Sequence, residues 1–448
     1  MGTVGINFGS ATSGAGFDVA STVTSILAVQ QAIETPWKTQ LAALQAQDTV
    51  FSTLGTDLST LSTSLSSLTS FDGVLAEKQG SSSNTNVLAL TSADTTAVAG
   101  SHSVVVTSLA TTASNYSDSI TNASDTLSGS VTINGHQISV VSGTSDTLKT
   151  FATAINNAAI GVTASIVSDA NGSRLSITSN TSGASGAITL SSNSLADSST
   201  STAIAFHTAQ AGVNAALTVD GLAVSSASNT VTGAIPGVTF QLLSSPLNTT
   251  VQIQVTNDNN AIETSLSSLV TAYNAVIKDI SGQEKTAQPL FGSPTLALIQ
   301  TQLQTAIFGG SASGSINSLS QLGLTTNQDG TLSIDTSALD NALNANFSDI
   351  VGFFQNTGSF GQSFSKTLSN LGNSSVNGAV SLAQQQNSTQ ETGLNDNISK
   401  QDASIANQKT ALTAELNAAN QVLQAIPLQL SEISQIYSAI SGYNQKNF

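Results

Sequence analysis

Cysteine is absent from the 448 residues, and charged side chains make up only 8% of them. Without cysteine the chain can form no disulfide, no Cys-ligated zinc site and no thiol nucleophile. Ten lysines and arginines are too few to neutralise a run of phosphates, and the net charge of −16 is repelled by nucleic acid and by anionic membrane surfaces. No run of about 18 apolar residues occurs, so no segment is expected to span a bilayer. We therefore expect neither a nucleic-acid nor a membrane partner.

The signatures of common catalytic sites are missing as well. His-Glu-x-x-His, Gly-x-Ser-x-Gly and the P-loop pattern do not occur, and the histidines His102, His136 and His207 are widely separated. Asp329 lacks the ligand spacing of a calcium loop, and its surroundings are typical of a hairpin turn. A polysaccharide-degrading enzyme needs paired carboxylates, whereas the strand-rich region offers scattered aspartates and the chain a single tryptophan. We expect no enzyme activity, no metal and no cofactor.

The chain opens with "MGTVGINFGSATSGAGFD", a glycine-rich leader before the first expected helix. It has neither the basic segment nor the continuous apolar segment of a secretory signal, so we expect no cleaved signal peptide. Few lysines and no cysteine suit a chain that is exported in the unfolded state. Asp18 is placed to cap the first helix, which extends to Pro36.

Apolar residues at helical spacing mark both ends of the chain. A stripe at residues 44–68 fits a heptad with apolar a and d positions, and a second heptad pattern covers residues 395–442. These two stripes can cover one another within one chain, although contact with another molecule is the alternative. Pro427 lacks the amide that would bond to the Leu423 carbonyl, so we expect a kink or a break there. The residues expected in the core of this helical leg are Leu44, Phe51, Leu54, Leu58, Leu61, Leu65, Leu68, Ile398, Ile405 and Leu412.

The outermost apolar positions lack an obvious cover within the chain. Each Leu or Ile withdrawn from water contributes roughly 1.5–3 kcal/mol, and an isolated helix gains none of this. We therefore expect other copies, or another helical protein, to complete their burial. The residues assigned to this oligomer or filament interface are Val19, Val23, Ile26, Ile33, Leu416, Leu423, Ile426, Leu430, Ile433, Tyr437 and Ile440.

Between the two ends, from about residue 76 to residue 258, the apolar period changes from helical to two, which predicts strands. Asn-Gly and Asp-Gly pairs mark turns, and one helix interrupts at residues 145–158. Residues 191–202 are expected to form a long surface loop or a domain crossing. The sequence predicts a multidomain α+β fold in which N- and C-terminal helices form a coiled-coil leg and β-rich head domains are inserted between them. The expected segments are 1–36 (leader and terminal helix), 37–75 (leg helix), 76–112 with 205–258 (first head domain), 113–204 (second head domain), 259–385 (leg helices with a hairpin) and 386–448 (C-terminal coiled coil).

Several stretches in this order resemble the bacterial flagellar filament cap family, also called flagellar hook-associated protein 2. "GAGFDVASTVTSILAVQQAIETPWKTQLAALQAQ" is similar to the opening of the family, and Ile155-Asn156 falls where the flagellin hook "IN" motif has its pair. The most specific match is "LSQLGLTTNQDGTLSIDTSALDNALNANFSDIVGFF", followed by the expected coiled coil. The C-terminal helix is poorer in charge than is typical of the family, and Pro427 interrupts it.

The resemblance implies a secreted, extracellular protein at the tip of the bacterial flagellum, exported by the flagellar type III route. It would form a homo-oligomeric ring, contact flagellin and the hook-associated junction proteins, bind an export chaperone, and promote the folding of exported flagellin without catalysis. The alternatives are flagellin itself, a hook–filament junction protein, or a surface adhesin whose β-rich head domains bind host glycans.

Overall fold

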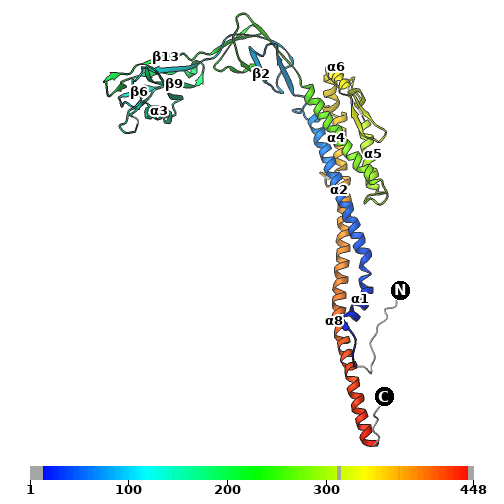
Figure 1. Cartoon of the computed structure of the whole chain (residues 1–448). Helices are drawn as coiled ribbons and strands as arrows, with labels where there is room; N and C mark the ends of the chain where they lie inside the picture. Colours follow the sequence, from blue (N-terminus) through cyan, green and yellow to red (C-terminus); the bar gives the residue numbers. More distant parts are fainter. Residues whose placement is uncertain (1–13, 145, 310–313, 373, 442–448) are drawn as a thin grey trace. The chain divides into compact units, whose positions relative to one another are not determined.

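The computed structural model of the chain describes residues 14–144, 146–309, 314–372 and 374–441 (Figure 1). Residues 1–13 of the leader lie outside this description. The chain divides into two compact units: a helical unit of Met1–Thr69 with Thr264–Phe448, and a β unit of Ser70–Glu263. The predicted α+β class is confirmed, because strands β1 to β18 lie in sequence between long helices from the two ends of the chain.

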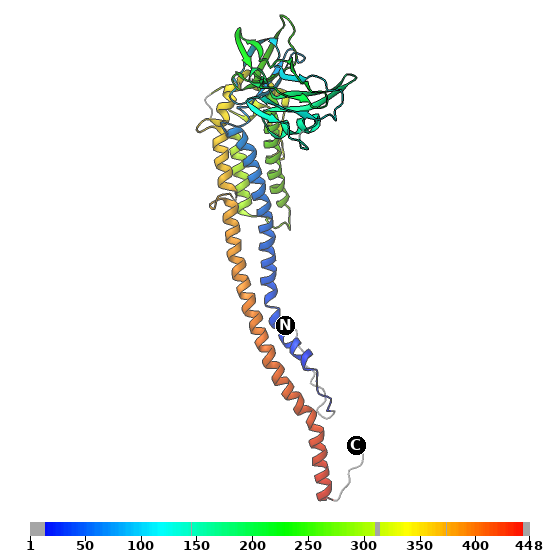
Figure 2. The same ribbon diagram turned by 90° about the vertical axis from the view of Figure 1, so that its left-hand side faces the viewer.

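The helical unit brings the two ends of the chain together. Its helices are α1 (Val19–Gln31), α2 (Glu34–Thr69), α4 (Asn259–Gln283), α5 (Pro294–Phe308), α6 (Thr336–Gln355), α7 (Phe360–Leu371) and α8 (Ala379–Ser441), with a 3-10 turn at Leu319–Leu322 and the short hairpin β19 (Leu324–Thr326) and β20 (Leu332–Ile334). Helix α2 packs along α8 and α7, and α1 packs along α8 (Figures 1 and 2).

Helix α2 shows why the leucine stripe folds as predicted. Five of its leucines are fully buried, at intervals of three and four that place them on one face: Leu54, Leu58, Leu61, Leu65 and Leu68. The opposite face carries Ser and Thr, whose hydroxyls donate to carbonyls four residues earlier, as Thr53 does to Thr49. Pro36 stands in the first turn, where amides have no partner inside the helix, and so it is compatible with the start of α2.

A phenylalanine cluster closes the core where α6 meets α7. Phe353 and Phe360 are stacked with ring centroids 4.8 Å apart, and Phe364 stacks on Phe360 at 5.5 Å. Phe354 meets Phe353 edge to face at 5.2 Å. All four rings are buried, so this cluster supplies a large part of the apolar area that fixes the two helices against each other.

The first part of the β unit is built from two antiparallel sheets. The five-stranded sheet has the order β1-β18-β3-β14-β15 and the other the order β16-β17-β2. Buried residues from both sheets form one apolar core, with Phe240 and Ile253 fully enclosed. The strands are β1 (Lys78–Ser82), β2 (Leu88–Ala93), β3 (Gly100–Ser108), β14 (Ala215–Val219), β15 (Leu222–Ser226), β16 (Thr230–Ile235), β17 (Val238–Leu242) and β18 (Thr250–Asn257).

The second part of the β unit has its own core beneath helix α3 (Leu148–Asn157). Its main sheet has the order β13-β4-β9-β8 and is accompanied by two small three-stranded sheets, β10-β6-β7 and β12-β11-β5. The strands are β4 (Thr112–Ser117), β5 (Leu127–Ser128), β6 (Ser130–Ile133), β7 (His136–Ser139), β8 (Val162–Asp169), β9 (Gly172–Ser182), β10 (Leu190–Ser191), β11 (Ala196–Asp197), β12 (Thr202–Ala203) and β13 (Phe206–Gln210).

The Ile155-Asn156 pair joins α3 to this sheet in two different ways. Ile155 is fully buried in the core, and the Asn156 side chain donates to the Ala164 carbonyl (2.8 Å) while accepting from the Ala164 amide (2.7 Å). One residue thus packs the helix and the next holds strand β8 beside it. The structural role of the pair follows from these contacts.

Two sequence predictions about local structure are wrong in part: the loop over the whole of residues 191–202, and a break of the last helix at Pro427. Residues 191–202 are not one continuous surface loop, since they contribute short pieces to β10, β11 and β12, and Leu195 is buried in the core. Helix α8 does not break at Pro427 but continues as one helix to Ser441.

Candidate assembly interface

The N-terminal part of α8 is covered by α2, as the paired heptads predict. Leu44 and Phe51 of α2 are buried, and Leu394 of α8 is buried as well. Asn387 of α8 donates to the carboxylate of Asp48 on α2 over 2.8 Å, which fixes the register of the two helices. Of the three α8 residues assigned to the leg core, Ile398 and Leu412 are half-buried and Ile405 is buried.

Farther along α8 the covering helix is α1. Asp18 caps α1 by accepting from the amides of Ala20 and Ser21, and Val23 then packs with Leu27 against Ile405. Val23 is only 2% exposed, so our assignment of this residue to an intermolecular interface is wrong, because α8 of the same chain covers it. Leu27 was not assigned to the stripe, although it lies one turn after Val23.

The edges of this contact remain partly accessible. Val19 and Leu416 are half-buried against the α1–α8 cluster, and Ile26 is half-buried on α1. Ile33 lies in the turn between α1 and α2 and is exposed, as is Val29 on α1. Of the N-terminal residues assigned to the interface, Ile33 is thus exposed in the single chain, Val19 and Ile26 are partly accessible, and Val23 is buried.

The last turns of α8 carry an apolar stripe that the described residues leave exposed. Leu423 and Ile426 are half-buried. Exposure rises beyond Pro427 to 48%, 62%, 62% and 81% at Leu430, Ile433, Tyr437 and Ile440, which we call the terminal stripe. Steps of three and four residues place these four side chains on one face of the helix. Contiguous exposed apolar surface of this kind marks an interaction site.

Three further apolar residues widen this surface, and the heptad pattern did not single them out. Val422, Leu428 and Ile436 are all more than half exposed on the same part of α8. They do not occupy a or d positions of the heptad, so a single partner helix packed on the a and d face would leave them exposed to water. Their presence indicates that more than one helix of a partner can pack here. Glu432 is the one charged residue between Pro427 and Ser441, so charge repulsion presents little barrier to such packing.

A pair of half-buried carboxylates, Asp57 of α2 and Asp279 of α4, lies in the helical unit. Burial, and next the hydrogen bond with Asp279, raise the pKa of Asp57 to about 6. The folded state therefore binds more protons than the unfolded state between the ordinary value of 3.8 and about 6. Stability falls as pH rises through this window.

Asp57→Asn is expected to remove this pH dependence. The asparagine amide can donate a hydrogen bond to Asp279 at any pH, whereas the aspartate must first bind a proton. The site is partly solvated, and screening reduces the expected stabilisation at pH 7.5 to about 1 kcal/mol. Thermal unfolding at pH 4.5 and 7.5, followed by the fluorescence of Trp37 in the same unit, measures it. Asp340→Asn, on the exposed face of α6, is the matched control. An equal loss of stability with pH in Asp57→Asn and the parent chain would contradict the assignment.

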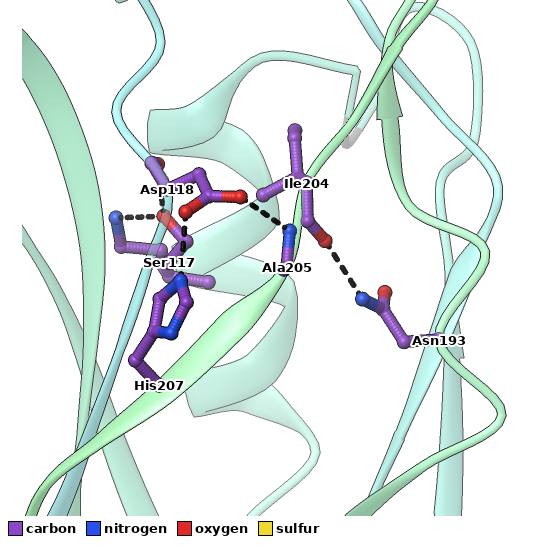
Figure 3. Close-up of polar contacts among 7 residues, drawn as sticks. Ser117, Asp118, Asn193, Ile204, Ala205 and His207 are labelled. Atoms are coloured by element: carbon purple, nitrogen blue, oxygen red, sulfur yellow. Dashed lines mark hydrogen bonds and ion pairs between the residues drawn. The ribbon is translucent and has the colours of Figure 1, made fainter.

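Two histidines of the β unit, His102 and His207, contact aspartates that link neighbouring strands. In Figure 3 Asp118 lies between Ala205 and His207, accepting from the Ala205 amide (2.9 Å) and bonding to His207 Nε2 (2.8 Å). The hydrogen bond from the Ala205 amide has the largest effect in lowering the pKa of Asp118, and the hydrogen bond with His207 has the next largest. Asp220 similarly accepts from the Ser103 amide (2.7 Å) and contacts His102 Nδ1 at 2.7 Å. These aspartates fasten neighbouring strands to one another.

Two searches of the described residues bear on other kinds of site. No group of three or more His, Cys, Asp or Glu side chains in that part of the chain gathers closely enough to hold a metal ion. Over the same residues, none of the helices combines the length and the hydropathy required to cross a bilayer. Asp329, considered as a calcium ligand, accepts instead from the amide of Thr331 within the β19–β20 hairpin.

Comparison with known proteins connects this architecture to one family. The model described as "Flagellar hook-associated protein 2 C-terminus" matches residues 212–435, and that described as "Flagellar hook-associated protein 2 N-terminus" matches residues 15–113. The B-type flagellar hook-associated protein 2 of Pseudomonas aeruginosa is 28% identical over 434 residues, which cover 88% of this chain and 90% of that protein. Flagellar hook-associated protein 2 of Escherichia coli K12 is 29% identical over 398 residues, covering 80% and 84%.

Among solved structures, the D1-D2-D3 domains of the flagellar cap protein from Escherichia coli match with a TM-score of 0.58 at 28% identity. The alignment covers 76% of this chain and 99% of the crystallised one.

Proposed function

Since the chain belongs to the flagellar hook-associated protein 2 family, we propose that it caps the distal tip of the bacterial flagellar filament as a homo-oligomeric ring. The two family models together match most of the chain, and the similar structure carries the name of a flagellar cap protein. Flagellin, a hook–filament junction protein and an adhesin are not favoured, because the matching relatives are named flagellar hook-associated protein 2.

The terminal stripe is the observation that supports assembly most directly. Four large apolar side chains on one helical face are exposed in the single chain, and a partner that buries them gains roughly 1.5–3 kcal/mol for each. Neighbouring copies in the ring, flagellin and the junction proteins are the helical partners that we propose for this surface. The protein works as a structural element without catalysis.

Export and location follow from the same role. We propose that the chain leaves the cell through the flagellar type III route, with an export chaperone covering its apolar ends, and acts outside the cell at the filament tip. Exported flagellin then folds beneath the ring formed by the cap.

Cells that lack this protein are expected to release flagellin into the medium and to assemble few or no filaments. Expressing the chain from a plasmid restores filaments, and gold-labelled antibody then marks their distal ends. Secreted flagellin is measured in the culture supernatant, and hook completion without the protein serves as the control for earlier assembly steps. Label along the whole filament would support a flagellin-like role instead, and label at the hook junction would support a junction protein.

A further inference from the structure

Strand β8 ends the main sheet of the second β core, whose order is β13-β4-β9-β8. Successive residues of an antiparallel strand turn their backbone amide and carbonyl alternately toward the paired strand and away from it. The Gly161 carbonyl, directly before β8, turns toward β9, because it accepts from the Asn180 amide over 3.0 Å. By this alternation, the outward amides and carbonyls of β8 belong to Val162, Ala164, Ile166 and Ser168.

The composition of β8 favours pairing of this edge with another strand. Residues 162–168 read VTASIVS, with no charge, no proline and no glycine, which is typical of segments that associate as strands. Natural edge strands are commonly guarded by a lysine, a proline or a bulge. β8 contains neither lysine nor proline, and its register with β9 runs without a shift from Val162 to Asp169. A different guard is therefore needed at this edge.

The side chain of Asn156, near the end of α3, supplies this guard. It donates to the Ala164 carbonyl over 2.8 Å and accepts from the Ala164 amide over 2.7 Å. A carboxamide presents one acceptor and one donor side by side, as a peptide group does, so it takes the place of a further strand. Asn156 is exposed whereas Ala164 is buried, which places the carboxamide between the sheet edge and solvent.

The same bonding arrangement occurs at two other places in the chain. Asn274 of α4 donates to the Leu332 carbonyl of β20 (2.8 Å) and accepts from the Leu332 amide (2.7 Å). Asn229, directly before β16, donates to the Ala110 carbonyl (3.0 Å) and accepts from the Ala110 amide (2.7 Å). The chain, in which only 8% of the side chains are charged, thus satisfies backbone groups outside its sheet ladders with neutral carboxamides.

We propose that Asn156 closes the edge of β8 against pairing with β8 of a second copy of this chain. Two identical edges can pair antiparallel about a two-fold axis, because each presents the same outward groups. While the carboxamide occupies Ala164, the uninterrupted outward run is limited to Ile166 and Ser168. Without the carboxamide, the run extends to all four outward residues. This closure is independent of the proposed function and prevents association of the β unit through its sheet edge.

Asn156→Ala in the full chain is expected to free the Ala164 amide and carbonyl and to promote strand pairing between copies. Because two further backbone hydrogen bonds become available, association should appear in sedimentation velocity at about tenfold lower concentration than in the parent chain. Asn157→Ala, at the exposed last residue of α3, is the matched control and should behave as the parent chain does. Ser165→Lys places a charge on the exposed face of the same strand and should reverse the association of Asn156→Ala. Unchanged association of Asn156→Ala, or association that survives Ser165→Lys, would overturn the proposal.

Hydrogen exchange resolved to single amides tests the cover without requiring association. In the parent chain the Ala164 amide should exchange slowly, as the Ser165 amide bonded to β9 does, whereas the outward Ile166 amide exchanges fast. In dilute Asn156→Ala, exchange of the Ala164 amide should become at least about tenfold faster, while slow exchange at Ser165 shows that β8 is still folded. An Ala164 amide that is as fast as that of Ile166 in the parent chain, or that stays slow in the variant, would show that the carboxamide does not close the edge.

Discussion

Replacing Ile433 and Ile440 together by serine is expected to abolish tip binding while leaving the folded chain intact. Both side chains are exposed in the single chain, so their loss removes no contact with the helical unit. In an assembled cap, each replacement forfeits roughly 1.5–3 kcal/mol of burial, which together weakens binding about 10²–10⁴-fold. Labelling of filament tips by the purified variant measures the loss, and thermal unfolding checks that the fold is unchanged.

Gln435→Ser supplies the control for this pair, because it changes a polar residue between the two isoleucines but on a different face of α8. It should label tips as well as the parent chain does. Undiminished labelling by the double serine variant would show that the terminal stripe takes no part in assembly. Labelling lost equally in Gln435→Ser would point to a general requirement for the helix end, without a specific apolar face.

Sequence periodicity was sufficient to predict the helices at both ends and the strand-rich region between them. The leucines of α2 could be assigned to a core because steps of three and four admit only one buried face. Periodicity does not identify the covering element, however. Val23 and Ile433 both belong to apolar stripes at helical spacing, yet α8 covers Val23, whereas Ile433, on α8 itself, is left exposed by the described residues. That difference depends on where α1 begins along α8, which only tertiary packing determines.

Features that join distant parts of the chain were the ones that sequence patterns missed. Asp57 and Asp279 are 222 positions apart in the numbering, and each resembles an ordinary exposed aspartate in its local sequence. Pro427 was expected to kink or break α8, since propensity alone penalises it, and the structure excludes the break because the helix continues past Pro427, with Gly14 packed against its ring. The short strands β11 and β12 escaped notice because two-residue strands carry no periodicity.

Phe360→Ala is expected to destabilise the helical unit by about 3–5 kcal/mol, the usual cost of emptying a buried phenylalanine site. The ring of Phe360 is stacked between Phe353 and Phe364, so truncation leaves a cavity and removes both aromatic contacts. Urea unfolding measures the loss through Trp37, the only tryptophan, which lies in α2 of this unit.

Phe308→Ala is the matched control, because Phe308 is 70% exposed on α5 and its removal should change stability by no more than about 0.5 kcal/mol. Phe360→Leu keeps most of the side-chain volume and should fall between the two variants. A loss below about 1 kcal/mol in Phe360→Ala would mean that the four rings do not form one packed cluster. A loss of stability of the expected size also weakens capping indirectly, since α7 packs against α2, and α2 covers the N-terminal part of α8.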